Sequence, residues 1–429
     1  MLQNREATDI GIGEQASSSK PTVVTTVIFL LLFSGPPMFR MRDPNESLEG
    51  AIDYVVVLRL IVLVIGGMWL LYQWRTRRKA GMRGLPFAIT SLQGLGLALV
   101  ACLAVSVFVS ASPSLTGFKV CEMLISLSFT ATFVGIYGVD ECLSKIFVGA
   151  TLLCAAIAIC VFIAPDMVLF ATETEALRLR GELIAPTEIV ASFGLILLVA
   201  RARKPSPLWF WSLFAFFGIL LAASLSRTAY AIIIVFLAMY LWKAKKRIYA
   251  YLVSASVAAL LLIGFVPSLG AYRNTESIFS LSDRVGLWAY LAAVTLQKSP
   301  WIGLGYYSAS RIYGPEYNEG LGTAHSMFFE AFIGGGLVAL SFVIALCAVG
   351  AFYAIKLLPG RGASTTFAAS TLFITALLFG SIGGDFGYGP LGITFWSLCA
   401  ILPILYERRG VELSAQRLRG PALRSPVNA

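Results

Sequence analysis

The sequence predicts an all-α, polytopic membrane protein that crosses the bilayer about twelve times. Its composition is 58% hydrophobic and only 13% charged, whereas about a quarter of the residues of a soluble domain are charged. Apolar runs of transmembrane length recur along the chain. Lysine and arginine gather in the short loops after every second run, as the positive-inside rule expects. This topological role accounts for the net charge of +10 and removes the need for a nucleic-acid partner.

A helix needs about 20 apolar residues to cross the hydrocarbon core. Residues 1–20 precede the first such run, and their polar composition predicts a disordered cytoplasmic tail. This tail is too long and too mixed in charge for a signal peptide, so the first span is expected to be retained. The polytopic membrane domain covers residues 21–406, and residues 407–429 form a basic cytoplasmic tail. The predicted spans are 22–39, 54–74, 87–109, 118–137, 145–164, 187–200, 207–224, 228–242, 248–267, 326–355, 364–384 and 389–406.

The distribution of basic residues predicts the orientation of these spans. With both termini in the cytoplasm, the loops after even-numbered spans face inward and are rich in lysine and arginine. These basic segments are 75–79, 201–204, 243–247, Lys356 with Arg361, and Arg408 with Arg409. The opposite, external segments are then 40–53, 110–117, 165–186, 224–227, 268–325 and 385–388. The longest of them, 268–325, interrupts the apolar sequence more than any other.

Charged residues inside the spans are expected to be few. Glu122, Glu188 and Glu330 fall near external ends, and Asp385 follows the eleventh span. A proton-coupled transporter would place such groups along a path through the bilayer, so this pattern argues against one. The seven cysteines lie in or beside apolar runs without metal-ligand spacing, and we expect neither a disulfide nor a metal site.

Arginines on the external side are unexpected under the positive-inside rule. They occur in separate loops and are Arg178, Arg180, Arg227, Arg273, Arg284 and Arg311. Each could form a salt bridge with a neighbouring acid. Together they could instead form an anion site, because guanidinium groups bind phosphate oxygens in pairs.

Residues 283–298 are predicted to form a helix in the outer membrane interface. Their apolar side chains recur at helical spacing, and Ser299-Pro300 ends the pattern. Arg284 and Trp288, four residues apart, share one face of this helix. An ordinary amphipathic surface helix with a snorkelling arginine would show the same pattern.

The segment after this helix contains glycines and tyrosines. Gly303 and Gly305 allow close approach of the backbone, and the segment lacks the lysine of a nucleotide-binding P-loop. Together with Trp288 of the preceding helix, Tyr306 and Tyr307 are candidate sugar-binding side chains, as aromatic rings stack on sugars. Interfacial tyrosines also anchor membrane proteins, so both interpretations remain open.

His325, the only histidine of the chain, lies just before the tenth span. A lone histidine is more often structural than catalytic. Its position beside several external arginines, however, suits a neutral imidazole that accepts a proton from an attacking hydroxyl.

Arg227 lies in a tight turn between two spans. The positive end of the helix that begins there adds to the attraction of Arg227 for phosphate.

Taken together, these residues resemble the O-antigen ligase and polysaccharide polymerase family of bacterial inner-membrane glycosyltransferases. The matching elements are Ser226-Arg227, Arg284 with Trp288, Pro300 with Gly303 and Gly305, and Ala324-His325-Ser326 with Gly336. Arg178-Leu179-Arg180-Gly181 followed by Pro186 resembles an earlier family element, although Thr187 stands where asparagine is commoner.

The resemblance implies a glycosyltransferase C-type fold without metal or cofactor and a site facing the periplasm. The donor would be a glycan on undecaprenyl diphosphate, and the acceptor a glycan or the lipid A core. Arg227 and Arg284, with Arg180 or Arg178, would bind the diphosphate, and His325 would activate the acceptor hydroxyl. Membrane lipids and other polysaccharide-assembly membrane proteins are the implied partners.

Two activities share this arrangement of residues. A polymerase would join repeat units into exopolysaccharide or O-antigen, and a ligase would transfer the finished glycan to the lipid A core. The modest external loops favour the polymerase. The alternative of another class is a transporter, such as a lipid-linked oligosaccharide flippase, which would need cationic residues at mid-depth. A purely structural subunit would leave the external arginines unexplained.

Overall fold

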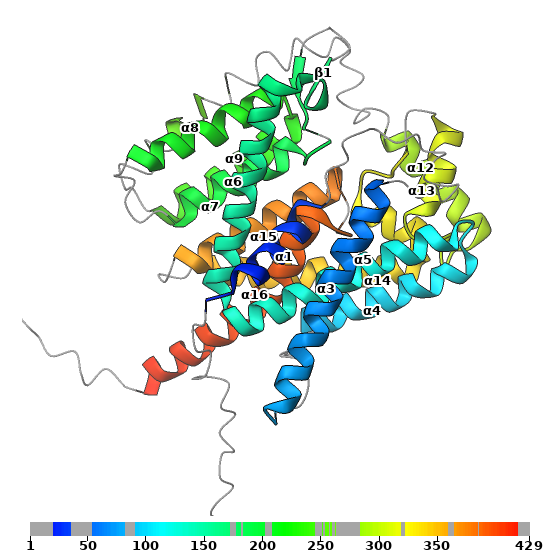
Figure 1. Ribbon diagram of the computed structural model, residues 1–429, viewed down its shortest axis with the longest axis horizontal. Helices are drawn as coiled ribbons and strands as arrows, with labels where there is room; N and C mark the ends of the chain where they lie inside the picture. Colours follow the sequence, from blue (N-terminus) through cyan, green and yellow to red (C-terminus); the bar gives the residue numbers. More distant parts are fainter. Residues whose placement is uncertain are drawn as a thin grey trace, which may run out of the picture.

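The computed structural model describes most of the chain. The described residues are 20–35, 54–81, 91–171, 177–181, 183–201, 208–244, 251, 254–256, 258–259, 262, 284–318, 322–358, 364–384 and 386–418. Figure 1 shows them as a bundle of α-helices with one short hairpin. The elements are α1 (Val23–Ser34), α3 (Tyr54–Lys79), α4 (Ser91–Val105), η1 (Ser106–Val109), α5 (Pro113–Tyr137), α6 (Val139–Ile163), η2 (Pro165–Met167), β1 (Leu169–Ala171), β2 (Leu177–Leu179), α7 (Thr187–Arg201), α8 (Leu208–Ala223), α9 (Arg227–Ala244), α12 (Arg284–Lys298), α13 (Ser308–Tyr317), α14 (Met327–Leu357), α15 (Ser364–Ile382) and α16 (Gly389–Leu418).

The helices confirm an all-α, multi-pass membrane protein. Seven helices of the described residues are long and apolar enough to cross a membrane. Each predicted span coincides with a helix except 248–267, which lies largely outside the described residues. Helices α1 and α8 are apolar but shorter than a usual span, so the total of about twelve remains a prediction. The last helix continues beyond the predicted boundary at 406 to Leu418.

The long apolar helices pack around α14, α15 and α16. Helix α14 contacts α4 and α15, α16 contacts α5 and α15, and α7 joins α15 to α6 and α8. Large side chains with almost no exposed surface fill this core, among them Trp396, Phe193 and Phe373. Two helices of the predicted external loop, α12 and α13, pack against each other and against α14 (Figure 1). The predicted helix at 283–298 is therefore present as α12, whereas its position in the membrane interface remains a prediction.

Helix ends with the same predicted orientation meet at the same end of the bundle. At the end predicted to be cytoplasmic, Asp140 accepts a hydrogen bond from Thr365 (2.6 Å) and lies 3.8 Å from the guanidinium of Arg201. These residues begin α6, begin α15 and end α7. The alternation of chain direction inferred from the basic loops is thus compatible with the packing of these three helices.

A break in α14 receives the glycine-containing segment that precedes α13. Gly336 has φ +68° inside the helix. At this break the amides of Leu304 and Gly305 donate to the carbonyls of Ile333 and Gly334 (2.8 and 3.1 Å), and Leu337 donates to Pro300 (2.8 Å). The close approach predicted from the glycines is present, and it satisfies backbone groups that the break would otherwise leave unpaired.

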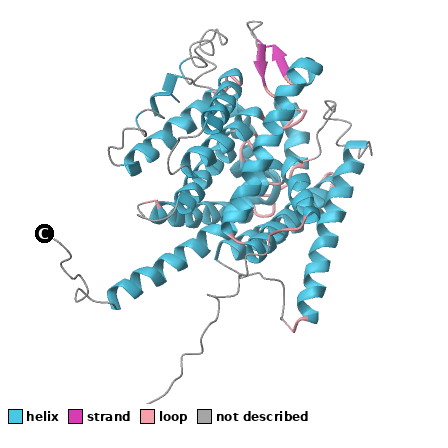
Figure 2. Cartoon of the chain, turned by 60° about the vertical axis from the view of Figure 1, so that its left-hand side comes forward, coloured by secondary structure: helices cyan, strands magenta, loops and turns pink. Residues whose placement is uncertain are grey.

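A short antiparallel hairpin, β1–β2, is not predicted by the sequence pattern. Phe170 pairs with Arg178 in its register, and Figure 2 shows the hairpin at one edge of the helical bundle. Gly181 then turns the chain toward α7 with φ +63°. A β-carbon there would lie 2.7 Å from the Ala185 carbonyl, so the turn requires glycine.

Candidate active site

A cavity of about 380 Å³ opens where five parts of the chain meet. Three of them are the end of α1, the first turns of α3 and the segment that enters α7. The other two are the region from Tyr307 to Glu330 and the connection between α15 and α16. Its lining includes Gly35, Arg59, Ala185, Pro186, Tyr307, Arg311, Thr323, His325, Glu330, Gly384 and Tyr388. Most of these positions fall in or near segments predicted to lie on the external side.

His325 is held at the wall of this cavity by contacts of the preceding residue. The Ala324 carbonyl accepts a hydrogen bond from the Trp288 indole (2.7 Å), and the Ala324 amide donates to Glu330 Oε1 (2.8 Å). His325 itself has φ +50°, a left-handed conformation that is uncommon outside glycine. Helices α12 and α14 therefore fix the backbone that carries the imidazole.

The surroundings of His325 favour the neutral imidazole. Burial, followed by the positive charges of Arg284, Arg180 and Arg311, lowers the pKa of His325 from 6.5 to about 4. An imidazole with this pKa is unprotonated near neutral pH and can accept a proton. The structure thus brings three guanidinium groups near the imidazole, from the segment after β2, from α12 and from α13.

We expect the His325 imidazole to titrate near pH 4 in the protein without substrate. As the chain has one histidine, selective isotope labelling would give a single imidazole signal whose pH titration can be followed by NMR, with a histidine-free affinity tag. Arg284→Gln should raise the midpoint because it removes a positive charge that disfavours the imidazolium. A wild-type midpoint near 6.5 would contradict the proposed environment.

The arginines predicted to form the site differ in their contacts and in their position relative to the cavity. The Arg284 guanidinium donates to the Ile382 carbonyl at the end of α15, and its charge lowers the pKa of His325. The charge of Arg180 also lowers the pKa of His325. Arg178 instead donates through Nε to the Ser224 carbonyl (2.6 Å) and so joins the hairpin to the turn before α9. Arg227 begins α9 and is not among the residues that line the cavity.

The predicted sugar-binding residues also differ in position. The Trp288 ring stacks on Phe329 with ring centroids 4.9 Å apart, so its contacts position the segment that carries His325. Tyr306 is 3% exposed and packs on Gly334, away from the cavity lining. Tyr307 does line the cavity, and its hydroxyl accepts a hydrogen bond from Arg311 (2.6 Å). Only Tyr307 of the three therefore presents its side chain to the cavity.

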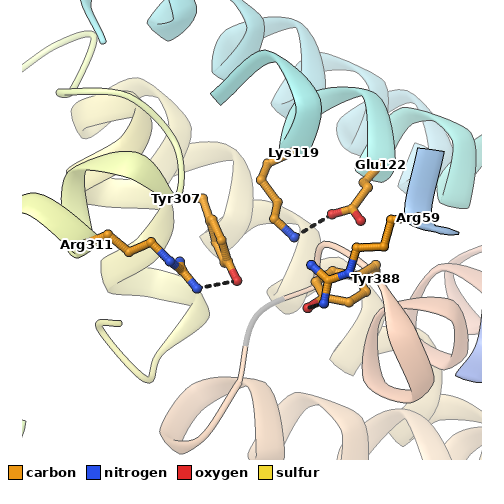
Figure 3. Close-up of polar contacts among 6 residues, drawn as sticks. All are labelled: Arg59, Lys119, Glu122, Tyr307, Arg311 and Tyr388. Carbon is orange, nitrogen blue, oxygen red and sulfur yellow. Dashed lines mark hydrogen bonds and ion pairs between the residues drawn. The ribbon is translucent and has the colours of Figure 1, made fainter. Parts of the chain in front are cut away.

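Three residues at the cavity or beneath it were not singled out from the sequence. Arg59 and Lys119 lie inside predicted spans, so the expectation that charges within spans are limited to a few acids was wrong. The signal was present, because a charge within an apolar run marks a functional site by default. Tyr388 lies between α15 and α16 and carries no comparable signal. Figure 3 shows all three residues close to Tyr307.

Comparison with protein families supports the interpretation of this region. Residues 211–344 match the family model described as O-antigen ligase. This part of the chain is similar to the O-antigen ligase family. The matched region contains Arg227, Arg284, the glycine segment and His325, whereas Arg59, Arg180 and Tyr388 lie outside it. No curated protein matches the chain.

Proposed function

We propose that the protein is a membrane glycosyltransferase that transfers a glycan from undecaprenyl diphosphate to a hydroxyl acceptor at the external face of the bacterial inner membrane. The supporting observation is that His325 lines a cavity and that burial and the charges of Arg284, Arg180 and Arg311 lower the pKa of its imidazole. The region that matches the O-antigen ligase model contains the histidine and two of these arginines.

In the proposed reaction, His325 accepts the proton of the acceptor hydroxyl as its oxygen attacks the anomeric carbon of the donor sugar. The bond between that carbon and the diphosphate oxygen breaks, and lipid diphosphate leaves with the electron pair. Arg284 and Arg180 stabilise the negative charge that develops on the leaving group. Diphosphate binding is assigned also to Arg227, at the start of α9, and Arg178 holds the turn before α9 through the Ser224 carbonyl. Independence of a metal is part of the proposal.

We favour polymerisation of exopolysaccharide or O-antigen repeat units over transfer of a finished glycan to the lipid A core. Both acceptors present a hydroxyl. We favour the polymerase because the external loops outside 268–325 are modest in size. Transport by a flippase is the competing function of another class. Arg59 and Lys119 lie near the helix ends that meet at the cavity, Arg59 in α3 and Lys119 in α5. This position fits a site at one face of the membrane better than the path across the bilayer that a transporter needs.

The function can be tested in a strain that lacks the gene and is complemented with wild type, His325→Asn or Arg227→Ala. Arg408→Ala, an exposed arginine of α16, is the control, and protein levels are matched. Surface and lipid-linked glycans are compared by size on gels. Loss of long polymer with single repeat units left is the expected result.

Other outcomes distinguish the alternatives. Full-length polymer that accumulates on its lipid carrier would assign the protein as a ligase. Wild-type glycan patterns in both site variants would reject the glycosyltransferase assignment and favour a transporter.

A further inference from the structure

A cluster of polar side chains lies at the inner wall of the cavity, between α3, α5, α13 and the α15–α16 connection. We call it the cationic cluster, and Figure 3 shows its members, which are Arg59, Lys119, Glu122, Tyr307, Arg311 and Tyr388. The reaction proposed above uses none of its charges directly. Its three basic residues come from separate helices and have different partners.

Lys119 is already compensated within the protein. Its ammonium lies 2.6 Å from Glu122, and the side chains of both residues are almost completely buried. The same ammonium lies 4.3 Å and 3.9 Å from the ring centroids of Tyr307 and Tyr388, distances typical of cation–π contacts. Lys119 therefore orients the two tyrosines and has its charge paired.

Arg59 and Arg311 are not compensated in this way. Arg59 is 9% exposed, and its Nη2 donates to the Tyr388 hydroxyl (2.8 Å). Arg311 stacks 3.6 Å from the Tyr307 ring centroid and donates to its hydroxyl. Within the described part of the chain, Arg59 Nε and Arg311 Nη1 are buried without a hydrogen-bond partner. Both side chains line the cavity.

Among the described residues, the nearby acids form no ion pair with these two guanidinium groups. Glu122 forms its ion pair with Lys119, and its charge also acts on Arg59. Glu330, which also lines the cavity, accepts hydrogen bonds from the Ala324 amide (2.8 Å) and the Ser310 hydroxyl (3.0 Å). No salt bridge among the described residues includes Arg59 or Arg311. Buried arginines require an anionic partner or an equivalent set of acceptors, which an anion in the cavity would provide.

We propose that Arg59 and Arg311 form an anion subsite that binds an acidic group, a carboxylate or a phosphate, on the acceptor glycan. The assignment to the acceptor rests on the function proposed above. Arg180 and Arg284, assigned to the donor diphosphate, do not line this cavity, whereas His325 does and is influenced by both sets of arginines. Arg59 and Arg311 would thus hold the acceptor in the cavity that His325 lines, while Arg180 and Arg284 remain for the donor.

The subsite can be tested by calorimetric titration of the purified full-length protein in lipid nanodiscs. The probes are methyl glucuronide for a carboxylate, glucose 6-phosphate for a phosphate, and methyl glucoside as the neutral control. We expect one acidic probe to bind wild type more tightly than the neutral sugar. Arg59→Gln and Arg311→Gln should each weaken that binding by about 10- to 100-fold, the usual effect of losing a hydrogen bond to a charged group.

Arg75→Gln is the matched control, since Arg75 is an exposed arginine of the same helix as Arg59. It should bind every probe as wild type does. Because Arg59→Gln could fail to fold, Tyr388→Phe provides a second variant that removes only the hydroxyl to which Arg59 donates, and it should weaken binding less. The tighter acidic probe identifies the group as a carboxylate or a phosphate.

Several results would overturn the proposal. Equal binding of acidic and neutral probes by wild type, or unchanged binding in Arg311→Gln, would remove the anion subsite. Inorganic pyrophosphate binding that requires Arg59 but not Arg284 would assign the subsite to the donor instead. Failure of the proposed function is distinguishable, because His325→Asn would then leave the glycans unchanged while the probes still bind.

Discussion

Replacing His325 with asparagine is expected to lower the turnover of glycan transfer by about 10²- to 10⁴-fold, the usual contribution of a general base. Asparagine is the most suitable substitution because it tolerates the left-handed backbone of this position. It cannot accept the hydroxyl proton. The rate would be measured with purified enzyme and lipid-linked donor, as glycan transferred per unit time under saturating substrate.

Two controls separate a chemical role of His325 from a structural one. The variant should keep the apparent unfolding temperature of wild type and its binding of pyrophosphate, since the arginines remain. Trp288→Phe, which removes the hydrogen bond to the Ala324 carbonyl, should reduce the rate less than His325→Asn does. An asparagine variant with more than about a tenth of wild-type turnover would exclude His325 as the base.

Gly303→Ala is expected to destabilise the protein by about 2–5 kcal/mol, because it combines an unfavourable backbone conformation with a steric clash. Gly303 has φ +76°, and an added β-carbon would lie 2.5 Å from the backbone of Gly334 and Gly335. The neighbouring backbone is itself fixed by the hydrogen bonds at the break of α14. Thermal unfolding in detergent, followed by tryptophan fluorescence, would measure the loss.

Gly81→Ala and Gly117→Ala are matched controls for this substitution. Gly81 also has a positive φ, of +75°, but a β-carbon there meets no atom within 4 Å, and Gly117 has neither constraint. We therefore expect a small loss for Gly81→Ala and a small gain for Gly117→Ala, which lies in a helix. Equal stability of the Gly303 and Gly81 variants would show that the glycine segment is not packed against α14 as described.

The Gly303 variant should also lose activity beyond its loss of stability. The segment leads directly into Tyr307 and Arg311, which line the cavity. A shift of this backbone by about one ångström would displace both side chains, and errors of this size reduce catalysis substantially.

The sequence by itself determined the multi-pass membrane character, predicted the direction of the helices and carried the resemblance to the O-antigen ligase family. These features depend on local properties, namely the length of apolar runs, the basic residues at their ends and the order of short motifs. Helix α12 was predicted within a residue of its observed start because its apolar spacing and its Ser299-Pro300 stop lie within the helix itself or directly after it. The same motifs directed attention to His325, Arg180 and Arg284.

Only the tertiary structure decided which polar groups meet. Arg59, Lys119 and Tyr388 come from segments far apart in the sequence, namely α3, α5 and the α15–α16 connection, and no local pattern indicates that their side chains meet. The same holds for Arg178, whose contact with the Ser224 carbonyl separates it from neighbouring Arg180. Hydropathy and spacing report the environment of one segment at a time, whereas the composition of a site depends on how separate segments pack. For that reason the arginines proposed to bind the donor could be anticipated from the sequence, and the cationic cluster could not.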